Sequence, residues 1–373
     1  MSNKHYDFLI VGAGLFGATC ARLLNDAGYE VLVIEKRNHI GGNIFTERKK
    51  DIDIHVYGAH IFHTSNEKVW SFVNRFSKFN SFINSPLANY KGEIYNLPFN
   101  MNTFVQLWPD VKSEEDALRH IKAEQEEISG GAPIKNLEQQ AIALVGKTIY
   151  KKLIKDYTEK QWNKKCTDLP AFIIKRIPLR FTFDNNYFND KYQGIPLEGY
   201  TELIAKMLNG IKVILNTDYL EKKNELEKLA SKIIYTGPID EYYNYLLGVL
   251  EYRSLRFVVK ELETDSFQGN AVVNYTSHDV PFTRIIEHKF FNFKNQKGTI
   301  ISEEYPEDWV IGKERFYTVN DDRNNRLYEE YFNLAKREKS VYFGGRLGMY
   351  KYFDMDDTVE AAFALVAKIK GNL

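Results

Sequence analysis

The sequence predicts an α/β fold that combines a parallel sheet with a helical-bundle insertion and an antiparallel β-sheet domain. Three observations support it. A strand–turn–helix–strand pattern occupies residues 8–35, and KIIYTG at 232–237 reads as a further buried strand of the same sheet. Residues from about 80 to 165 have apolar side chains at helical spacing, and Ser113 with Asp116 in SEEDALRHIKAEQEEI predicts a capping box at the start of one helix. Residues 171–195 and 252–318 alternate or are β-rich, which indicates antiparallel strands.

A glycine motif joins the first strand to the first helix. It reads G-x-G-x-x-G at Gly12, Gly14 and Gly17, and the second strand ends on Glu35. The glycines allow a tight turn and a close approach of the backbone to a pyrophosphate, and the helix start supplies N–H donors. Glu35 is placed to accept a hydrogen bond from a ribose hydroxyl. The pattern therefore predicts a Rossmann-like dinucleotide-binding domain.

A second glycine pair distinguishes FAD from NAD. Gly41 and Gly42 follow the acid in EKRNHIGGN, as in flavoproteins of the amine-oxidase and glutathione-reductase kind. Near the C-terminus, GGR at 344–346 precedes DMDDTVEAAF at 354–363, which predicts a helix start suited to the flavin ring. An ordinary capped helix would give that second pattern by itself. Together with the N-terminal motif, the two patterns favour FAD.

Composition and charge argue against several kinds of partner. Lys+Arg and Asp+Glu number 50 each, so the formal net charge is zero and nothing indicates nucleic acid or a membrane surface. No apolar run approaches the roughly 20 residues of a membrane span, and no signal-peptide pattern is present. Cys20 and Cys166 form no C-x-x-C pair. The sequence therefore predicts a reduced, cytoplasmic protein that holds any anionic ligand with local cations.

Five longer strings carry a family resemblance. YGAHIFHT, YTEKQW, IIKRIPLRFTFDNNYF, VPFTRIIEHK and GRLGMYKYFDMD occur in this order, and from residue 7 to about 365 the chain resembles the bacterial UDP-galactopyranose mutases. The resemblance implies an FAD-binding Rossmann-like domain with a helical-bundle insertion and an antiparallel β-sheet domain. It implies an isomerase that interconverts UDP-galactopyranose and UDP-galactofuranose, by attack of reduced FAD N5 on the anomeric carbon with transient release of UDP. It also implies a supply of galactofuranose for surface glycans, a homodimer and an external reductant for FAD.

Two arginines are the candidate catalytic residues. A nucleotide-sugar diphosphate carries about two negative charges, and guanidinium forks match phosphate oxygens in pairs. Arg176 and Arg284 each lie in an otherwise apolar stretch. A surface ion pair is the ordinary alternative for either residue, but the resemblance places both at diphosphate-clamping positions.

The resemblance implies further substrate and cofactor contacts, with Tyr157 stacking on uracil. ERFYT replaces the family's usual P-Y-Y-P around one of the tyrosines. The other substrate-binding residues would be Asn84, Leu153, Thr158, Trp162, Tyr187, Asn274, Tyr317, Tyr352 and Asp354. The cofactor-binding residues would be Gly12, Gly14, Phe16, Gly17, Glu35, Lys36, Gly42, Asn43, His60, Ile61, His63, Arg346, Asp354, Met355, Asp356 and Thr358.

Other chemistries are less well supported by the residues. His60 and His63 form an H-x-x-H, but no third ligand stands at a familiar spacing, so no metal site is expected. Cys166 is expected in a polar loop, and neither cysteine has a base or partner thiol nearby in sequence, so no thiol nucleophile is expected. The same chemistry on UDP-N-acetylgalactosamine is a second candidate function. A flavin amine oxidase or desaturase and a non-catalytic flavin-binding regulator are two further candidate classes.

Three domains are expected, two of them discontinuous. The FAD-binding domain would comprise residues 1–80, about 197–245 and about 325–373. The helical domain would span about 81–165. The antiparallel sheet substrate domain would comprise about 166–196 and about 246–324.

Overall fold

The computed structural model describes residues 5–126, 134–174, 177–293 and 296–371. The chain divides into two compact units, each assembled from separate segments. Unit 1 consists of Met1–Ser81, Asp190–Ser254 and Trp309–Leu373, and unit 2 of Phe82–Asn189 and Leu255–Asp308. The finer division into three domains stays a prediction.

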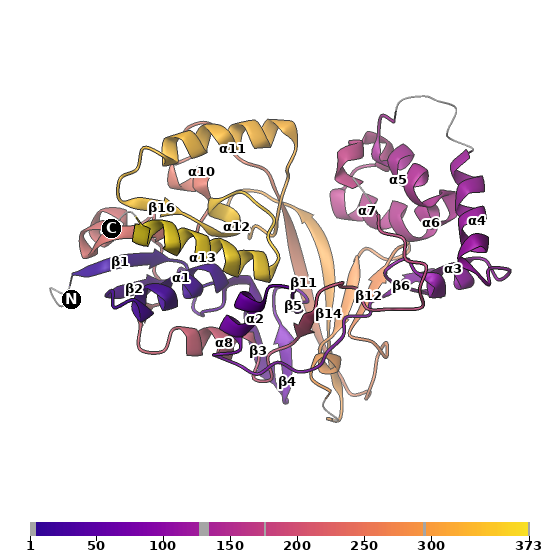
Figure 1. Cartoon of the computed structure of the whole chain (residues 1–373), viewed down its shortest axis with the longest axis horizontal. Coiled ribbons are helices and arrows are strands. Elements are labelled where there is room, and N and C mark those ends of the chain that lie inside the picture. Colours follow the sequence, from indigo (N-terminus) through magenta and orange to yellow (C-terminus); the bar gives the residue numbers. More distant parts are fainter. Residues whose placement is uncertain (1–4, 127–133, 175–176, 294–295, 372–373) are drawn as a thin grey trace. The chain divides into compact units, whose positions relative to one another are not determined.

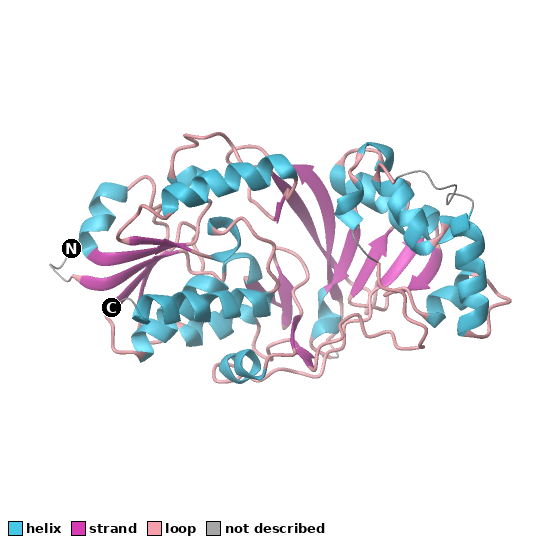
Figure 2. Ribbon diagram, turned by 45° about the horizontal axis from the view of Figure 1, so that its top comes forward, coloured by secondary structure: helices cyan, strands magenta, loops and turns pink. Residues whose placement is uncertain are grey.

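A five-stranded parallel sheet forms the centre of unit 1, with helices on either side (Figure 2). Its order is β16-β10-β1-β2-β9. The bounds are β1 (Tyr6–Val11), β2 (Val31–Ile34), β9 (Lys212–Ile214), β10 (Ala230–Tyr235) and β16 (Val341–Phe343). Leu9 and Ile10 of the central strand are fully buried, as expected for a parallel strand covered on both faces. The predicted strands β1, β2 and β10 are thus confirmed.

The remaining elements of unit 1 surround this sheet. Helix α1 packs along α13, as Figure 1 shows. The helices are α1 (Leu15–Asp26), η1 (Gly42–Ile44), α2 (Glu67–Val73), α8 (Tyr200–Met207), α9 (Lys223–Leu226), η5 (Glu227–Leu229), α10 (Ile239–Tyr242), α11 (Asp322–Ala335), α12 (Gly345–Gly348) and α13 (Met355–Gly371). The short strands are β3 (Thr46–Lys49), paired with β4 (Ile52–His55), and β5 (Phe62–Thr64), paired with β8 (Tyr192–Gly194).

Unit 2 contains a mainly antiparallel sheet, so the prediction of antiparallel strands within 252–318 is confirmed. The order is β11-β14-β13-β12-β6-β7, and only the β12–β6 pairing among those with a described register is parallel. The bounds are β6 (Leu87–Tyr90), β7 (Glu93–Asn96), β11 (Tyr252–Leu262), β12 (Val272–Tyr275), β13 (Arg284–Glu287) and β14 (Thr299–Asp308). The first residues of β11 belong to unit 1, where they pair with β15 (Tyr317–Thr318).

The helical part of unit 2 encloses its own apolar cluster, which includes Phe104, Ile121 and Leu137. The predicted capping box is confirmed, because the Asp116 N–H donates to Ser113 Oγ (3.2 Å) and the Ser113 N–H donates to Asp116 Oδ2 (3.1 Å). The helices are α3 (Met101–Leu107), α4 (Glu114–Glu126), α5 (Leu137–Val145), α6 (Lys147–Ile149), η2 (Tyr150–Ile154, a π-helical turn), α7 (Lys155–Trp162), η3 (Cys166–Asp168), η4 (Ala171–Ile174) and η6 (His288–Phe291).

Two expectations for secondary structure need correction. The stretch expected to be mostly helical, about 80–165, also contributes the strands β6 and β7 to the sheet. The β-rich stretch 171–195 contributes less strand than expected, since among its described residues only β8 is a strand, and it pairs antiparallel with β5. In this stretch, side chains form hydrogen bonds with backbone groups that a neighbouring strand would otherwise pair with. Asn100 Nδ2 donates to the Asp184 carbonyl (2.8 Å), and the Asn186 N–H donates to Asp184 Oδ1 (2.9 Å).

Long apolar helices are also absent from the described part of the chain. None of the helices there combines the length and the apolar character needed to cross a lipid bilayer.

Candidate active site

The turn between β1 and α1 leaves no room for side chains at two of its glycines. A Cβ on Gly17 would lie 2.0 Å from the Gly12 carbonyl oxygen, which is fixed backbone. Gly12 has a φ of +105°, and a Cβ there would lie 2.2 Å from Thr236 Oγ1. The bare backbone of this turn leads into α1, whose N-cap is Gly14. This is the geometry that a bound diphosphate requires.

The second predicted glycine pair packs directly against this first turn. The Gly41 N–H donates to the Ala13 carbonyl (2.9 Å), and a Cβ on Gly42 would lie 3.0 Å from Gly14 Cα. Gly41 and Gly42 have φ values of +97° and +55°. Two stretches of uncovered backbone therefore lie together, and this cradle fits a dinucleotide such as FAD.

Polar side chains border the two turns. Glu35 is buried, its Oε2 accepts from the Ala13 N–H (2.8 Å) and its Oε1 accepts from the Arg37 N–H (2.9 Å). Each carboxylate oxygen has a further lone pair, so Glu35 can still accept from a ribose hydroxyl. Asn43 accepts from Arg37 (3.0 Å), whereas Lys36 is exposed.

Replacing Glu35 should weaken the binding of FAD selectively. Loss of a charge-assisted hydrogen bond costs about 1.5–3 kcal/mol, so Glu35→Ala should raise the Kd for FAD at least about tenfold. Equilibrium dialysis of apoprotein with FAD measures this. The Kd for UDP should stay unchanged, because Tyr157 and Arg284 belong to unit 2. Glu47→Ala, at an exposed acid on β3, is the matched control. FAD affinity equal to that of wild type in Glu35→Ala would remove this residue from the site.

The C-terminal glycine turn is built onto the N-terminal one through Phe16. A Cβ on Gly344 would lie 2.3 Å from the Phe16 ring, and the Gly344 N–H donates to the Tyr235 carbonyl (3.0 Å). Phe16 is itself buried on α1. The C-terminal glycine turn therefore packs in the same cofactor domain as the N-terminal glycine turn, although the two turns are far apart in the sequence.

The start of α13 gathers several predicted residues in unit 1. The Thr358 hydroxyl donates to the Asp354 carbonyl (2.8 Å), and this hydrogen bond spans the first turn of the helix. Burial raises the pKa of Asp356, one residue after Met355. The helix begins at Met355, so the predicted helix start is confirmed.

A small aromatic cluster precedes that helix. The Tyr317 and Tyr352 rings stack with centroids 5.8 Å apart, and the Arg346 guanidinium lies 4.5 Å from the centroid of the Tyr352 ring. Arg346 also donates to the Phe316 carbonyl (3.2 Å). The structure thus brings together Tyr317, Tyr352 and Arg346 despite the departure from the family's P-Y-Y-P string.

The H-x-x-H histidines have protein partners. His60 Nδ1 lies 2.7 Å from the Gly58 carbonyl oxygen, and His63 Nδ1 lies 2.7 Å from Asp190 Oδ2. The residue between them in the predicted set, Ile61, is buried. Asp190 was not predicted, because it pairs with His63 across 127 positions and has no local signal.

Unit 2 assembles the second group of predicted residues around Arg284. Its Nε donates to Asn274 Oδ1 (3.0 Å), and one terminal nitrogen lies 3.4 Å from the Tyr157 hydroxyl. The other terminal nitrogen lies 3.6 Å from Glu304 Oε2. Asn274 and Glu304 are the cross-strand neighbours of Arg284 on β12 and β14. Burial raises the pKa of Tyr157, against the effect of the Arg284 charge, so its hydroxyl is protonated at neutral pH.

The other predicted substrate residues vary in burial. Asn84, Leu153 and Thr158 are buried, and Trp162 packs beside the helical apolar cluster. Tyr187 is exposed, and its N–H donates to the Asn84 carbonyl (2.8 Å). Arg176 lies outside the described residues.

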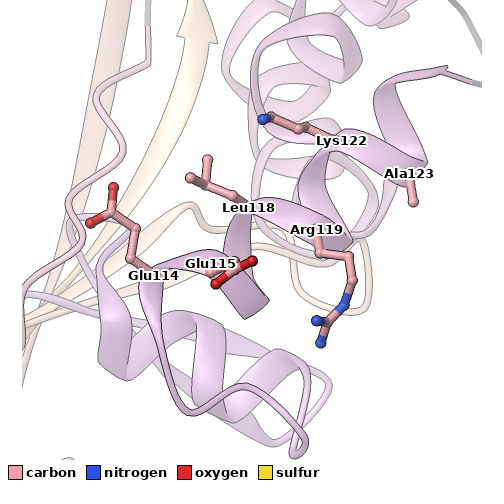
Figure 3. A pocket seen from close by; sticks show the side chains of 6 residues that line it. All are labelled: Glu114, Glu115, Leu118, Arg119, Lys122 and Ala123. Carbon is pink, nitrogen blue, oxygen red and sulfur yellow. The ribbon is translucent and has the colours of Figure 1, made fainter.

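Two other features lie apart from these groups. A surface depression on α4 is surrounded by charges of both signs and contains none of the predicted residues (Figure 3); its lining is Glu114, Glu115, Leu118, Arg119, Lys122 and Ala123. Cys166 is buried in η3 and not in a polar loop as expected, because its side chain packs into the helical apolar cluster. Burial raises the pKa of both cysteine thiols, that of Cys166 to about 11, so both are protonated at neutral pH.

Comparisons with known proteins match both the N-terminal glycine turns and the region that contains the Arg284 cluster. A profile of the UDP-galactopyranose mutase family matches residues 152–352, and one of NAD(P)-binding Rossmann-like domains matches residues 10–76. A probable UDP-galactopyranose mutase of Klebsiella pneumoniae is 39% identical over 97% of this chain and 94% of its own length. The dTDP-fucopyranose mutase of Escherichia coli is 37% identical over 95% and 96%. The fold matches a crystal structure of reduced UDP-galactopyranose mutase with a TM-score of 0.74, at 15% identity over 99% of this chain and 94% of that one.

Proposed function

The chain belongs to the UDP-galactopyranose mutase family of flavin-dependent isomerases, and we propose that it interconverts UDP-galactopyranose and UDP-galactofuranose. The observation that supports this substrate class best is the Arg284 cluster of unit 2. There a guanidinium is oriented by Asn274 and accompanied by the protonated hydroxyl of Tyr157. Such a fork suits a diphosphate, and an aromatic ring beside it suits a nucleobase.

We propose FAD as the cofactor, held by unit 1. Its diphosphate and ribose would bind at Gly12, Gly14, Gly17, Gly42 and Glu35, where the packed glycine turns leave the backbone uncovered. The remaining predicted contacts would be Phe16, Lys36, Asn43, His60, Ile61, His63, Arg346, Asp354, Met355, Asp356 and Thr358. When bound, reduced FAD supplies a nucleophilic nitrogen, N5, for the anomeric carbon of the sugar.

The protein's own part is to hold the substrate and to neutralise charge. When the bond between the anomeric carbon and the diphosphate breaks, negative charge develops on UDP. Arg284, together with Arg176, would stabilise that charge and retain UDP until it returns to the sugar. Asn274 would keep the Arg284 fork in one orientation. Neither cysteine is a thiolate at neutral pH, so the nucleophile would be the cofactor.

Turnover of defined sugar nucleotides tests the proposed function. Protein loaded with FAD and reduced anaerobically should convert UDP-galactofuranose to UDP-galactopyranose, as seen by chromatography. The 2-acetamido analogue is the second substrate in the assay. A dTDP-fucofuranose arm is included because a relative named for dTDP-fucopyranose is 37% identical. Peroxide release from amines without any sugar turnover would indicate an oxidase instead, and no turnover at all would indicate a non-catalytic flavoprotein.

We also propose three properties of the working enzyme from its family. It would be a homodimer, it would act in the cytoplasm and it would receive electrons from an external reductant. Its product would supply galactofuranose for surface glycans.

The other substrate contacts would come from Asn84, Leu153, Thr158, Trp162, Tyr187, Tyr317, Tyr352 and Asp354.

A further inference from the structure

Helix α7 carries a lysine that holds the loop between β12 and β13. Lys160 Nζ donates to the backbone carbonyls of Tyr275 (2.7 Å), Phe282 (2.8 Å) and Val280 (3.3 Å). An ammonium group has three protons, so these three acceptors can use all of them. The ammonium group is therefore occupied by the loop and does not remain to bind a substrate.

Two acids on the same helix add to this attachment. Asp156 Oδ2 accepts from the His278 N–H (3.2 Å), and His278 Nε2 lies 3.2 Å from Glu159 Oε2. These acids contact only the middle of the loop, whereas Lys160 reaches both of its ends. Burial lowers the pKa of Lys160 to about 8, as expected for an ammonium drawn away from water.

The loop is important because of what its two strands carry. It joins Asn274 on β12 to Arg284 on β13, and α7 carries Tyr157, whose hydroxyl lies 3.4 Å from Arg284. We propose that Lys160 is a positioning residue, which fixes the β12–β13 loop against α7 and thereby sets Arg284 and Tyr157 for a nucleoside diphosphate. This inference rests on the proposed function of the Arg284 cluster.

The physical consequence of losing the ammonium is local. Three carbonyl oxygens that converge on one cation repel one another once it is gone, and two of them belong to the loop between the strands. The loop would then relax away from α7. Arg284 would lose its fixed distance from Tyr157, while the sheet pairing of β13 with β14 would remain.

Unit 2 contains a matched control for this test. Lys289, on η6 at the opposite end of β13, also donates to three backbone carbonyls, those of Asp265 (2.7 Å), Gln296 (2.9 Å) and Gly298 (3.1 Å). Lys289→Met therefore removes the same kind of contact from the same unit. It does so away from the loop that joins Asn274 to Arg284.

The experiment measures the Kd for UDP by isothermal titration calorimetry, with the melting temperature and FAD content of each variant. We expect Lys160→Met to raise the Kd at least about tenfold, since the Arg284 fork would no longer be preorganised for the diphosphate. Lys289→Met should stay within about twofold of wild type. Lys160→Gln, which keeps two amide protons, should lie between wild type and Lys160→Met, and it supplies the test if Lys160→Met does not fold.

The outcomes separate this inference from the function on which it rests. Arg284→Ala is measured alongside, and if it binds UDP as wild type does, the proposed diphosphate site is wrong. If Arg284→Ala loses affinity but Lys160→Met and Lys160→Gln do not, only the role of Lys160 is overturned. Equal losses in Lys160→Met and Lys289→Met would also overturn it, because they would indicate a general loosening of unit 2.

Discussion

Turnover should disappear when the flavin is oxidised and return when it is reduced. N5 is nucleophilic toward the anomeric carbon only in the reduced flavin, because in the oxidised flavin it is an electron-poor imine nitrogen. Both thiols of the chain are protonated and buried. Removing the nucleophile of a covalent mechanism abolishes most of the rate enhancement, so the oxidised enzyme should be more than about a thousandfold slower. The measurement is the rate of UDP-galactofuranose conversion under anaerobic conditions.

The control must separate flavin reduction from side effects of the reductant. Reduction by dithionite and reduction by light should give the same rate, and reoxidation in air should remove it. Protein without FAD should be inactive in every condition. Equal rates with oxidised and reduced flavin would contradict the nucleophilic role of the cofactor.

Arg284→Ala should give the second large effect. Its fork would contribute two charge-assisted hydrogen bonds to the diphosphate, each worth about 1.5–3 kcal/mol. Their loss should lower kcat/KM by more than about a hundredfold, since each 1.4 kcal/mol is a factor of about ten. Steady-state kinetics with the reduced enzyme measures this, and the FAD content should remain normal because Arg284 lies in unit 2.

Two further variants sharpen the interpretation of Arg284. Arg284→Lys keeps the charge but loses the planar fork, so it should recover only part of the activity. Arg256→Ala is the matched control, because this arginine lies on β11 in the same unit, is half exposed and pairs with Glu307 (3.0 Å). The kcat/KM of Arg256→Ala should stay within about twofold of wild type.

For Arg176, the alanine and lysine variants should each lower kcat/KM at least about tenfold. Wild-type rates in Arg284→Ala and Arg176→Ala would overturn the diphosphate assignment.

The parts of the fold that could be predicted are those with local signals. The glycine turn after β1, the buried strand β10, the capping box at Ser113 and the start of α13 each depend on a few adjacent residues. The sequence predicts these features because the residues that stabilise each of them are neighbours in the sequence as well as in the fold. The strands β6 and β7 lacked them, since four-residue strands obtain their stability from pairing with each other and with β12.

The same distinction applies to the candidate site. The motif strings contain Arg284 and Tyr157, the family resemblance added Asn274, and the structure places these three in one cluster. Neither Glu304 nor Lys160 could be assigned from its own surroundings in the sequence. Lys160 finds its carbonyl partners 115 to 122 positions along the chain, and that distance is set only by the fold.

The interleaved strand order of unit 1 also constrains how the protein is made. Strand β1 pairs with β10 from Tyr6↔Ala230 onward, and β16 joins the other side of β10 at Ile233↔Val341. At translation speeds of about 5–20 residues per second, the ribosome needs about 10–45 seconds to deliver β10 after β1. Through that interval, the backbone N–H and C=O groups of β1 that will pair with β10 remain unpaired, and the apolar side chains of β1 remain uncovered on the nascent chain. A chaperone that covers nascent apolar segments would protect this edge, and slower growth at low temperature should favour soluble protein over aggregates.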